Sequence, residues 1–228
     1  MKNYNTQKNQ TTRGILSIAC ATALAVAFTV SLPQPAHAGH VTPPSVPPEI
    51  QVPAGNKAFL EGHGVGTQNY VCRPSGSGVK FVLFTPQATL FNDDGKQLTT
   101  HFFSPNPFEA NTDPTVVGDD MIRVTWQHSR DSSTVWAQLD APPAFVTQDA
   151  IPWLRLKVPP AGGVQEGPTG GDTLTKTTFI QRVNTSGGTA PSTGCNSLMD
   201  VGNQAFVPYT ANYFFYKKAG ESDADGGN

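Results

Sequence analysis

The side chains best suited to chemistry are histidines and neighbouring aspartates: His63, Asp93, Asp94, His101, His128 and Asp131. Neutral imidazole binds transition metals such as zinc or copper and acts as an acid or base near neutral pH. No HxH or HExxH spacing links the three histidines, so two interpretations stay open. In the first, loops bring His63, His101 and His128 together around a zinc or copper ion. In the second, each histidine caps a turn or packs beside an aromatic ring, and no cofactor is bound.

The segment from His128 to Asp131, with Ser129, Ser132 or Ser133, contains the residue types of a catalytic triad. Adjacent side chains in one short loop rarely converge as nucleophile, base and orienting group. The chain also lacks a GxSxG motif. These observations argue against a serine-dependent enzyme, although they leave open whether the protein catalyses another reaction.

Three further side chains are candidates for ligand contact. Trp136 and Trp153 fall on the phase opposite to the aliphatic residues of their expected strands, so both are exposed if one sheet face is solvated. Arg182 precedes the glycine pair Gly187-Gly188, and its guanidinium suits a ligand carboxylate. The competing interpretation is that the tryptophans pack in the core and that Arg182 pairs with an acidic side chain across the sheet.

The elements that must position these residues begin after an export signal. Basic residues precede an apolar run over residues 14–32, and Ala36-His37-Ala38 is a small-x-small cleavage motif. We therefore expect residues 1–38 to be a signal peptide cleaved after Ala38, with the mature protein secreted or periplasmic and without a transmembrane segment. An uncleaved membrane anchor and a lipoprotein acylated at Cys20 fit the sequence less well.

Composition narrows the possible partners and predicts one cross-link. The signal carries three basic residues, which leaves 12 basic against 17 acidic residues in the mature chain. Nucleic acid is excluded as a partner because no basic stripe is present. Cys72 and Cys195 remain as an even pair in an oxidising compartment and predict a disulfide, with metal thiolates as the weaker alternative.

The mature chain divides into three parts. Residues 39–53 are rich in proline and predict an extended lead-in that wraps onto the domain. Residues 54–218 form one domain, and residues 219–228, which are mostly glycine and acidic, predict a disordered tail.

Apolar residues recur with period two throughout the domain, which is the pattern of β-strands. Residues 121–127 and 133–139 alternate most clearly and predict a hairpin, and a second hairpin is expected around the Asp94-Gly95 step. Further strands fit residues 69–72, 79–84, 153–158, 177–184 and 211–217. No capped helical window of ten residues is present. The expected class is all-β, as a two-sheet sandwich or jelly roll, with a closed β-barrel as the alternative.

Several blocks of sequence, taken together, carry a family resemblance. They are VGTQNYVC (65–72), TPQATL (85–90), residues 95–101, TWQHSRDSSTVW (125–136), AIPWLRL (150–156), TTFIQRVNTSGGTAPSTGC (177–195) and VPYTANYFFY (207–216). In this order they resemble an uncharacterised family of exported proteins, catalogued as domain of unknown function 3455. This chain has Gln87 where relatives usually carry an acidic residue, which excludes a carboxylate role at that position. It also has Asp131-Ser132-Ser133 where relatives commonly read DGS. The resemblance implies how far the domain extends along the chain and in which compartment the protein works, but it does not imply a mechanism.

Some members of that family carry a malate dehydrogenase label, which the residues do not support. The segment from Gly62 to Thr67 lacks the last glycine of GxGxxG and leads into a strand, so no helix N-terminus is available for a pyrophosphate. We reject an NAD-dependent dehydrogenase. The expected function is binding or structural, with an unidentified extracellular or cell-surface ligand and no predicted cofactor. The alternative is a histidine-dependent enzyme that binds a transition metal.

Overall fold

The structure is a computed structural model that describes residues 41–109 and 122–221. The predicted signal peptide (1–38), the first two residues of the lead-in and residues 222–228 of the predicted tail lie outside these ranges. Two short 3₁₀ helices, η1 (Pro48–Ile50) and η2 (Leu198–Asp200), are the only helices in the described part of the chain. None of its helices is long and apolar enough to cross a membrane.

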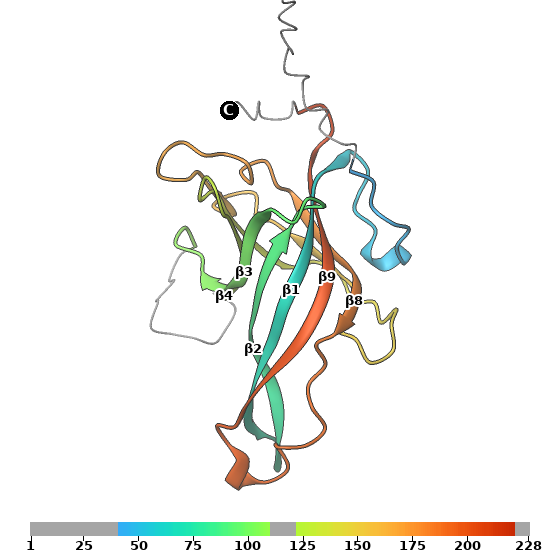
Figure 1. The fold of residues 1–228 in the computed structure, drawn as a ribbon, viewed down its shortest axis with the longest axis vertical. Coiled ribbons are helices and arrows are strands. Elements are labelled where there is room, and N and C mark those ends of the chain that lie inside the picture. The colour runs from blue at the N-terminus through green and yellow to red at the C-terminus, as the bar shows by residue number, and fades with distance from the viewer. Residues whose placement is uncertain (1–40, 110–121, 222–228) are drawn as a thin grey trace, which may run out of the picture. The chain divides into compact units, whose positions relative to one another are not determined.

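Nine β-strands account for most of the described chain (Figure 1). They are β1 (Asn56–Ser75), β2 (Gly78–Phe91), β3 (Gln97–Pro105), β4 (Ile122–His128), β5 (Thr134–Leu139), β6 (Leu154–Lys157), β7 (Val164–Gln165), β8 (Phe179–Gly187) and β9 (Gln204–Lys218). All pairings are antiparallel, and both expected hairpins, β2–β3 and β4–β5, are present. The prediction of an all-β domain is confirmed.

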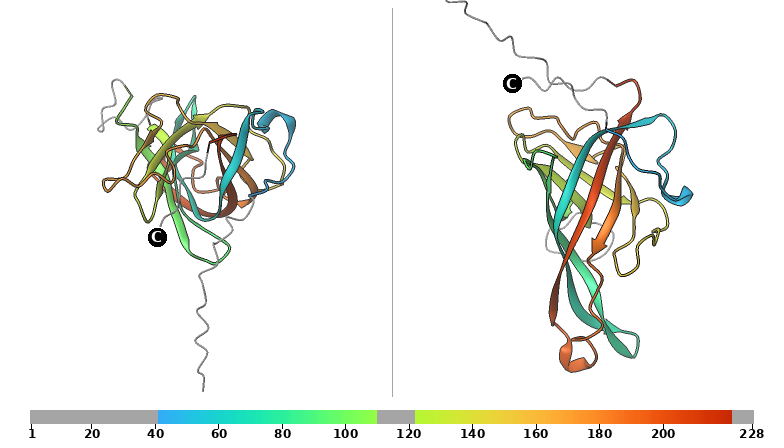
Figure 2. Two further views of the ribbon diagram at one scale, coloured as in Figure 1. Left: turned by 90° about the horizontal axis from the view of Figure 1, so that it is seen from above. Right: turned by 45° about the vertical axis from the view of Figure 1, so that its right-hand side comes forward.

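The strands close into a barrel, which was the alternative arrangement in the sequence analysis. The sheet runs in the order β4-β3-β2-β1-β9-β8-β6-β5-β7, and an additional pairing joins β4, at one end, to β5, the last strand but one at the other end. Eight strands therefore form a ring, visible from above in Figure 2, and β7 pairs only with β5. In an eight-stranded barrel the interior is just wide enough to be filled by side chains or to hold one small ligand.

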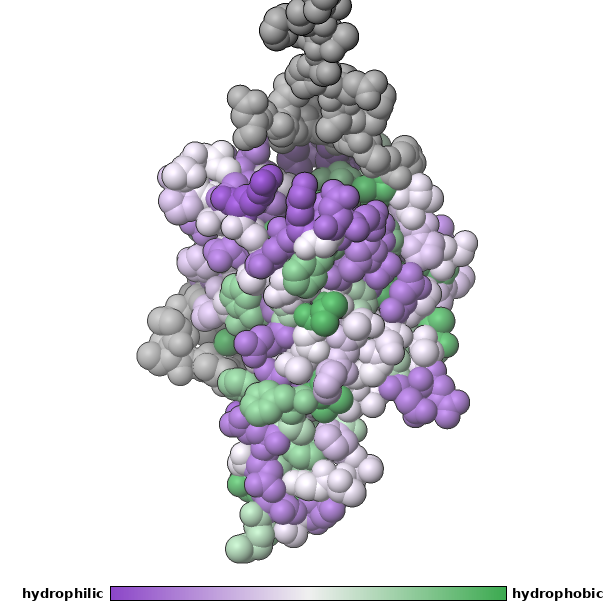
Figure 3. Space-filling model, viewed as in Figure 1, coloured by the Kyte–Doolittle hydropathy of each residue, from purple (hydrophilic) through white to green (hydrophobic). Residues whose placement is uncertain are grey.

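Strands β1, β2 and β9 are longer than the ring requires, and their far ends form an arm that projects from the barrel (Figure 1). On the face that carries these strands, hydrophobic residues are interspersed with hydrophilic ones (Figure 3). The expectation of short strands was wrong for β1, where only residues 69–72 were expected and the strand begins at Asn56.

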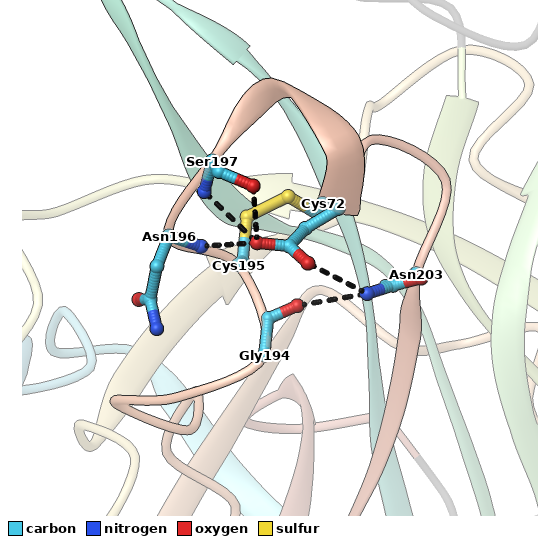
Figure 4. Close-up of a disulfide and its surroundings, with 7 residues drawn as sticks. Cys72, Gly194, Cys195, Asn196, Ser197 and Asn203 are labelled. Carbon is cyan, nitrogen blue, oxygen red and sulfur yellow. Dashed lines mark hydrogen bonds between the residues drawn. A yellow bond between two sulfur atoms is a disulfide. The ribbon is translucent and has the colours of Figure 1, made fainter.

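A disulfide joins Cys72 of β1 to Cys195 in the loop before β9, as expected (Figure 4). The two cysteines are 123 residues apart in the sequence. In the chain-entropy model, a cross-link that closes so long a loop constrains the unfolded chain and thereby stabilises the fold by about 4 to 5 kcal/mol. The surrounding loop is ordered by the Asp200 carboxylate, which accepts hydrogen bonds from the backbone N–H groups of Asn196 and Ser197. The same contacts hold the pKa of Asp200 below its usual range.

The proline-rich segment packs against the outside of the barrel. Ile50 is fully buried there, in a cluster that includes Phe179 and Val183 of β8 and Phe214 of β9. The Gln181 side chain donates a hydrogen bond of 2.7 Å to the carbonyl oxygen of Ile50. The outer face of β8 and β9 is therefore covered by chain rather than by solvent.

Within the Gly62–Thr67 segment of β1, the residues on the inner face are all glycines. A Cβ atom at Gly62 would lie 3.0 Å from Leu90, and one at Gly64 would lie 2.7 Å from the Tyr213 ring. At Gly66 it would lie 2.1 Å from the carbonyl oxygen of Gln87 and 2.5 Å from Ala88 Cα. These glycines make room for the side chains and backbone of neighbouring strands.

We predict that Gly66→Ala lowers the free energy of unfolding by about 2 to 3 kcal/mol, because the new methyl group meets backbone atoms that cannot rotate away. Gly78→Ala is the matched control, since a Cβ atom at Gly78 meets nothing within 4 Å. Urea denaturation of both variants gives the comparison. Equal stability of the two variants would contradict the close approach of β1 and β2.

Candidate binding site inside the barrel

A cavity of about 220 Å³ lies among the inward-facing side chains of the barrel. Strands β1, β2, β3, β4, β6, β8 and β9, with the segment before β6, all contribute to its wall. The lining residues are Gln68, Tyr70, Leu83, Pro86, His101, Phe103, Val124, Trp126, Ile151, Pro152, Leu154, Leu156, Arg182 and Tyr213. Most are apolar, and the polar groups are few, which is the usual composition of a small-molecule site.

His101 and Trp126 form one wall of the cavity. They are register partners on β3 and β4, and their rings stack with centroids 4.3 Å apart and an interplanar angle of 11°. The Thr125 carbonyl oxygen lies 3.0 Å from His101 Nδ1, and because a carbonyl only accepts, Nδ1 is the donor. Burial lowers the pKa of His101 to about 3, with a smaller contribution from the Arg182 charge. His101 is therefore neutral at physiological pH, with Nε2 as a hydrogen-bond acceptor.

Arg182 enters the cavity from β8, beside Leu154 of β6 and Tyr213 of β9 in the strand register. Its side chain donates two hydrogen bonds, from Nε at 3.2 Å and Nη2 at 2.8 Å, to one acceptor, the carbonyl oxygen of Pro152. The expected acidic partner across the sheet was wrong, since in the described part of the chain Arg182 makes no ion pair. Arg123 and Arg155, outside the cavity, are paired with Glu109 and Asp140.

Two of the lining residues, Trp126 and Gln68, carry donors that are buried in the barrel wall. Trp126 Nε1 makes no hydrogen bond to the described part of the chain. The Gln68 side chain interacts with the Tyr209 hydroxyl, which opposes the effect of burial on the pKa of Tyr209. Buried N–H groups are rarely left unpaired in proteins, so the environment of the Trp126 indole is unusual.

The three histidines do not share a site. His63 lies on β1, where Asp93 Oδ1 is 2.7 Å from its Nε2 and Asn212 is 3.2 Å from its Nδ1. The Asp93 contact is the main cause of the raised pKa of His63. His128 ends β4, and its Nδ1 lies 2.8 Å from Asp131 Oδ1. Among the residues that the structure describes, no three His, Cys, Asp or Glu side chains are grouped as for a metal ion.

The loop after β4 is organised around the Asp131 carboxylate and is not arranged as a triad. Its Oδ1 accepts hydrogen bonds from the backbone and hydroxyl of Ser133 at 2.9 and 2.7 Å, and its Oδ2 accepts two from Thr173 at 3.1 and 2.6 Å. The Ser133 hydroxyl thus donates to the carboxylate and not to His128. Burial alone would raise the pKa of Asp131, but these hydrogen bonds outweigh it and hold the pKa well below its usual range.

Trp136 and Trp153 point out of the barrel, as their phase predicted, but the expected exposure is wrong. They are only 5% and 8% exposed. Trp136 donates a hydrogen bond of 2.9 Å to Ser104 Oγ and packs edge-on against Phe108. Trp153 lies in the cluster covered by the proline-rich lead-in. The condition for exposure, a solvated sheet face, does not hold at either position because loops cover the outer wall.

Of the six residues proposed from the sequence for ligands or metal, His101 and Arg182 line the same cavity, and the other four lie elsewhere. Gln68, Trp126 and Tyr213, which also line the cavity, were not among these six. For Trp126 the alternation in residues 121–127 did predict an inward position with Val124. For Gln68 the sequence gave no signal, because a polar residue amid a glycine-rich strand is usually exposed.

A comparison with protein families decides the affiliation of the chain. The model of the family described as "Protein of unknown function (DUF3455)" matches residues 53–217. The chain belongs to this family. The match covers every strand of the DUF3455 barrel except the last residue of β9. No curated protein and no solved structure matches the chain.

We predict that Asp131→Asn lowers the free energy of unfolding by about 2 to 3 kcal/mol at pH 7, because several charge-assisted hydrogen bonds weaken together. A carboxylate with a lowered folded pKa stabilises the fold above its unfolded pKa of about 3.9, and this stabilisation is lost as the pH falls toward the folded pKa. The difference between wild type and variant should therefore shrink below about pH 4.

Denaturation curves of both proteins from pH 3 to 7 measure this difference. Asp94→Asn is the control, because the Asp94 side chain is 73% exposed and lies 4.0 Å from Lys96. The account of the loop is wrong if the two substitutions have the same effect, or if the Asp131 effect does not depend on pH.

Proposed function

We propose that this DUF3455 protein is an exported binding protein that holds one small, mainly apolar molecule inside its barrel. The observation that supports this most strongly is the cavity of about 220 Å³ among the side chains of the barrel, which is partly open to solvent. Ligand sites commonly occupy the interior or mouth of a barrel, where apolar walls remove the ligand from water and a few polar groups fix its orientation. The cavity has both features.

The volume limits the size of the ligand. An apolar cavity of about 150 Å³ holds benzene, so by proportion a cavity of 220 Å³ holds roughly nine non-hydrogen atoms. Drug-sized molecules need pockets of about 300 Å³ or more. The ligand is therefore a small aromatic or short aliphatic compound rather than a polysaccharide, a peptide or a long-chain lipid.

The working compartment is part of the proposal. The charged front, apolar run and cleavage motif of residues 1–38 support export. A disulfide forms and persists in an oxidising compartment, which fits the Cys72–Cys195 bond.

If export is correct, expression of the full chain in a bacterial host should yield protein in the periplasm or medium whose mass corresponds to residues 39–228. Intact-mass spectrometry and N-terminal sequencing of each fraction check this. Recovery of the chain only in the cytoplasm, still beginning at Met1, would contradict it.

Binding is tested with two neutral probes of about the right size, benzamide and hexanamide. We expect both to shift the indole N–H resonance of Trp126 in ¹H–¹⁵N NMR spectra of the mature protein, because the Trp126 side chain lines the cavity. The Trp136 indole, which is bonded to Ser104, is the internal control. Single Trp→Phe variants assign the resonances.

A variant that fills the cavity should block binding. Leu154→Trp adds bulk to the wall, whereas Leu139→Trp makes the same change at a side chain that is 52% exposed and does not line the cavity. We expect loss of the probe-induced shift in the first variant and its retention in the second. If neither probe perturbs Trp126 in the wild-type protein at millimolar concentration, the proposed function is wrong.

A further inference from the structure

The guanidinium of Arg182 is buried, and the described part of the chain provides it with no countercharge. The residue is 9% exposed, and in residues 41–109 and 122–221 no carboxylate forms an ion pair with it. Its Nε and Nη2 donate to one neutral oxygen, that of Pro152, and its other hydrogen-bonding neighbour is the neutral Tyr213 hydroxyl. Arginine remains charged in proteins, so a full positive charge stands at the wall of the cavity.

Such a charge is costly to bury. Removing an ion from water costs several kcal/mol even after the protein relaxes, and one carbonyl dipole offsets only part of that cost. The charge also acts on its neighbours. It contributes to the lowered pKa of His101. Burial raises the pKa of Tyr213, and the Arg182 charge partly counteracts this rise. An anion in the cavity would supply the missing countercharge.

The hydrogen-bonding groups of the cavity point in the same direction. The head of Arg182 consists only of donors. His101, which also lines the cavity, has Nε2 as an acceptor because Nδ1 is already engaged. A ligand that satisfies this set must offer more acceptors than donors.

Resting on the proposed function, we propose that the ligand is a small apolar monocarboxylic acid, bound as the carboxylate with its charge against the Arg182 guanidinium. A carboxylate matches the planar fork of arginine with two parallel hydrogen bonds. A dianion such as a phosphate monoester fits less well, because Arg182 is the only basic side chain other than the neutral His101 among the residues that line the cavity. The remaining walls are apolar and receive the hydrocarbon part.

The test compares each acid with its neutral isostere: benzoate with benzamide, and hexanoate with hexanamide. At pH 7 we expect the wild-type protein to bind each carboxylate about ten- to a hundredfold more tightly than the amide, which is the usual range for a hydrogen bond to a charged group. Arg182→Gln should reduce this preference to about one. Arg73→Gln removes the same charge from an exposed position of β1 and should leave the preference intact.

The outcomes separate the two proposals. Equal affinity of acid and amide in the wild-type protein overturns the carboxylate assignment while leaving the binding function in place, whereas failure of all four probes to bind contradicts the binding function itself. A preference that survives in Arg182→Gln also overturns the assignment. Should Arg182→Gln not fold, the Nε–H resonance of Arg182 in the wild-type protein decides: it must shift with benzoate and not with benzamide.

Discussion

The pairing of the first long strand with the last one is the constraint on which the rest of this structure depends. Strands β1 and β9 are in register from Asn56–Lys218 to Val71–Gln204, which joins the two ends of the domain along its full length. Without this pairing, β1 and β9 would each become an open edge and the inner face would be solvated. The disulfide lies at the far end of the same pairing, where Cys72 also exchanges backbone hydrogen bonds with Gly202 and Asn203.

Closure turns one face of a twisted sheet into the barrel interior. Some side chains on that face fill the interior, and others line the cavity. Leu90, Trp126 and Phe215 are fully buried and fill the barrel. Glycines on β1 leave the space that Tyr213 occupies. Where the filling is incomplete the cavity remains, and the polar groups of His101 and Arg182 stand at its wall. Because the barrel wall shields the guanidinium from bulk water, the charge of Arg182 interacts more strongly with other charges than it would on the surface.

Local features of this fold could be predicted from the sequence, and long-range ones could not. The β4–β5 hairpin follows from strict alternation in residues 121–127 and 133–139, and the Asp94-Gly95 step marks the β2–β3 turn. The Cys72–Cys195 bond follows from the even number of cysteines that remain after the predicted signal peptide. Most of β1 was missed because its inward positions are glycine, which carries no apolar signal. The choice of barrel over sandwich depends on which distant strands meet, and alternation does not encode that.

The site was predictable only in part, for a related reason. Alternation assigns a side chain to one of two faces but does not say what covers that face. Trp136 and Trp153 were placed on the outer face correctly, yet loops and the lead-in bury them. Two roles were proposed for Arg182: binding the carboxylate of a ligand, or pairing with an acidic side chain of the protein. Only the three-dimensional arrangement shows that the described part of the chain supplies no acidic partner. Gln68 lines the cavity only because the strands close into a ring, which the sequence pattern does not predict.

The most direct test of this account is a crystal structure of the mature protein grown in the presence of benzoate. The account predicts a closed eight-stranded ring with a benzoate inside it, the carboxylate in hydrogen-bond contact with the Arg182 guanidinium and the phenyl ring against the apolar wall. A barrel interior without benzoate, in which Arg182 is paired with a carboxylate of the protein itself, would contradict it.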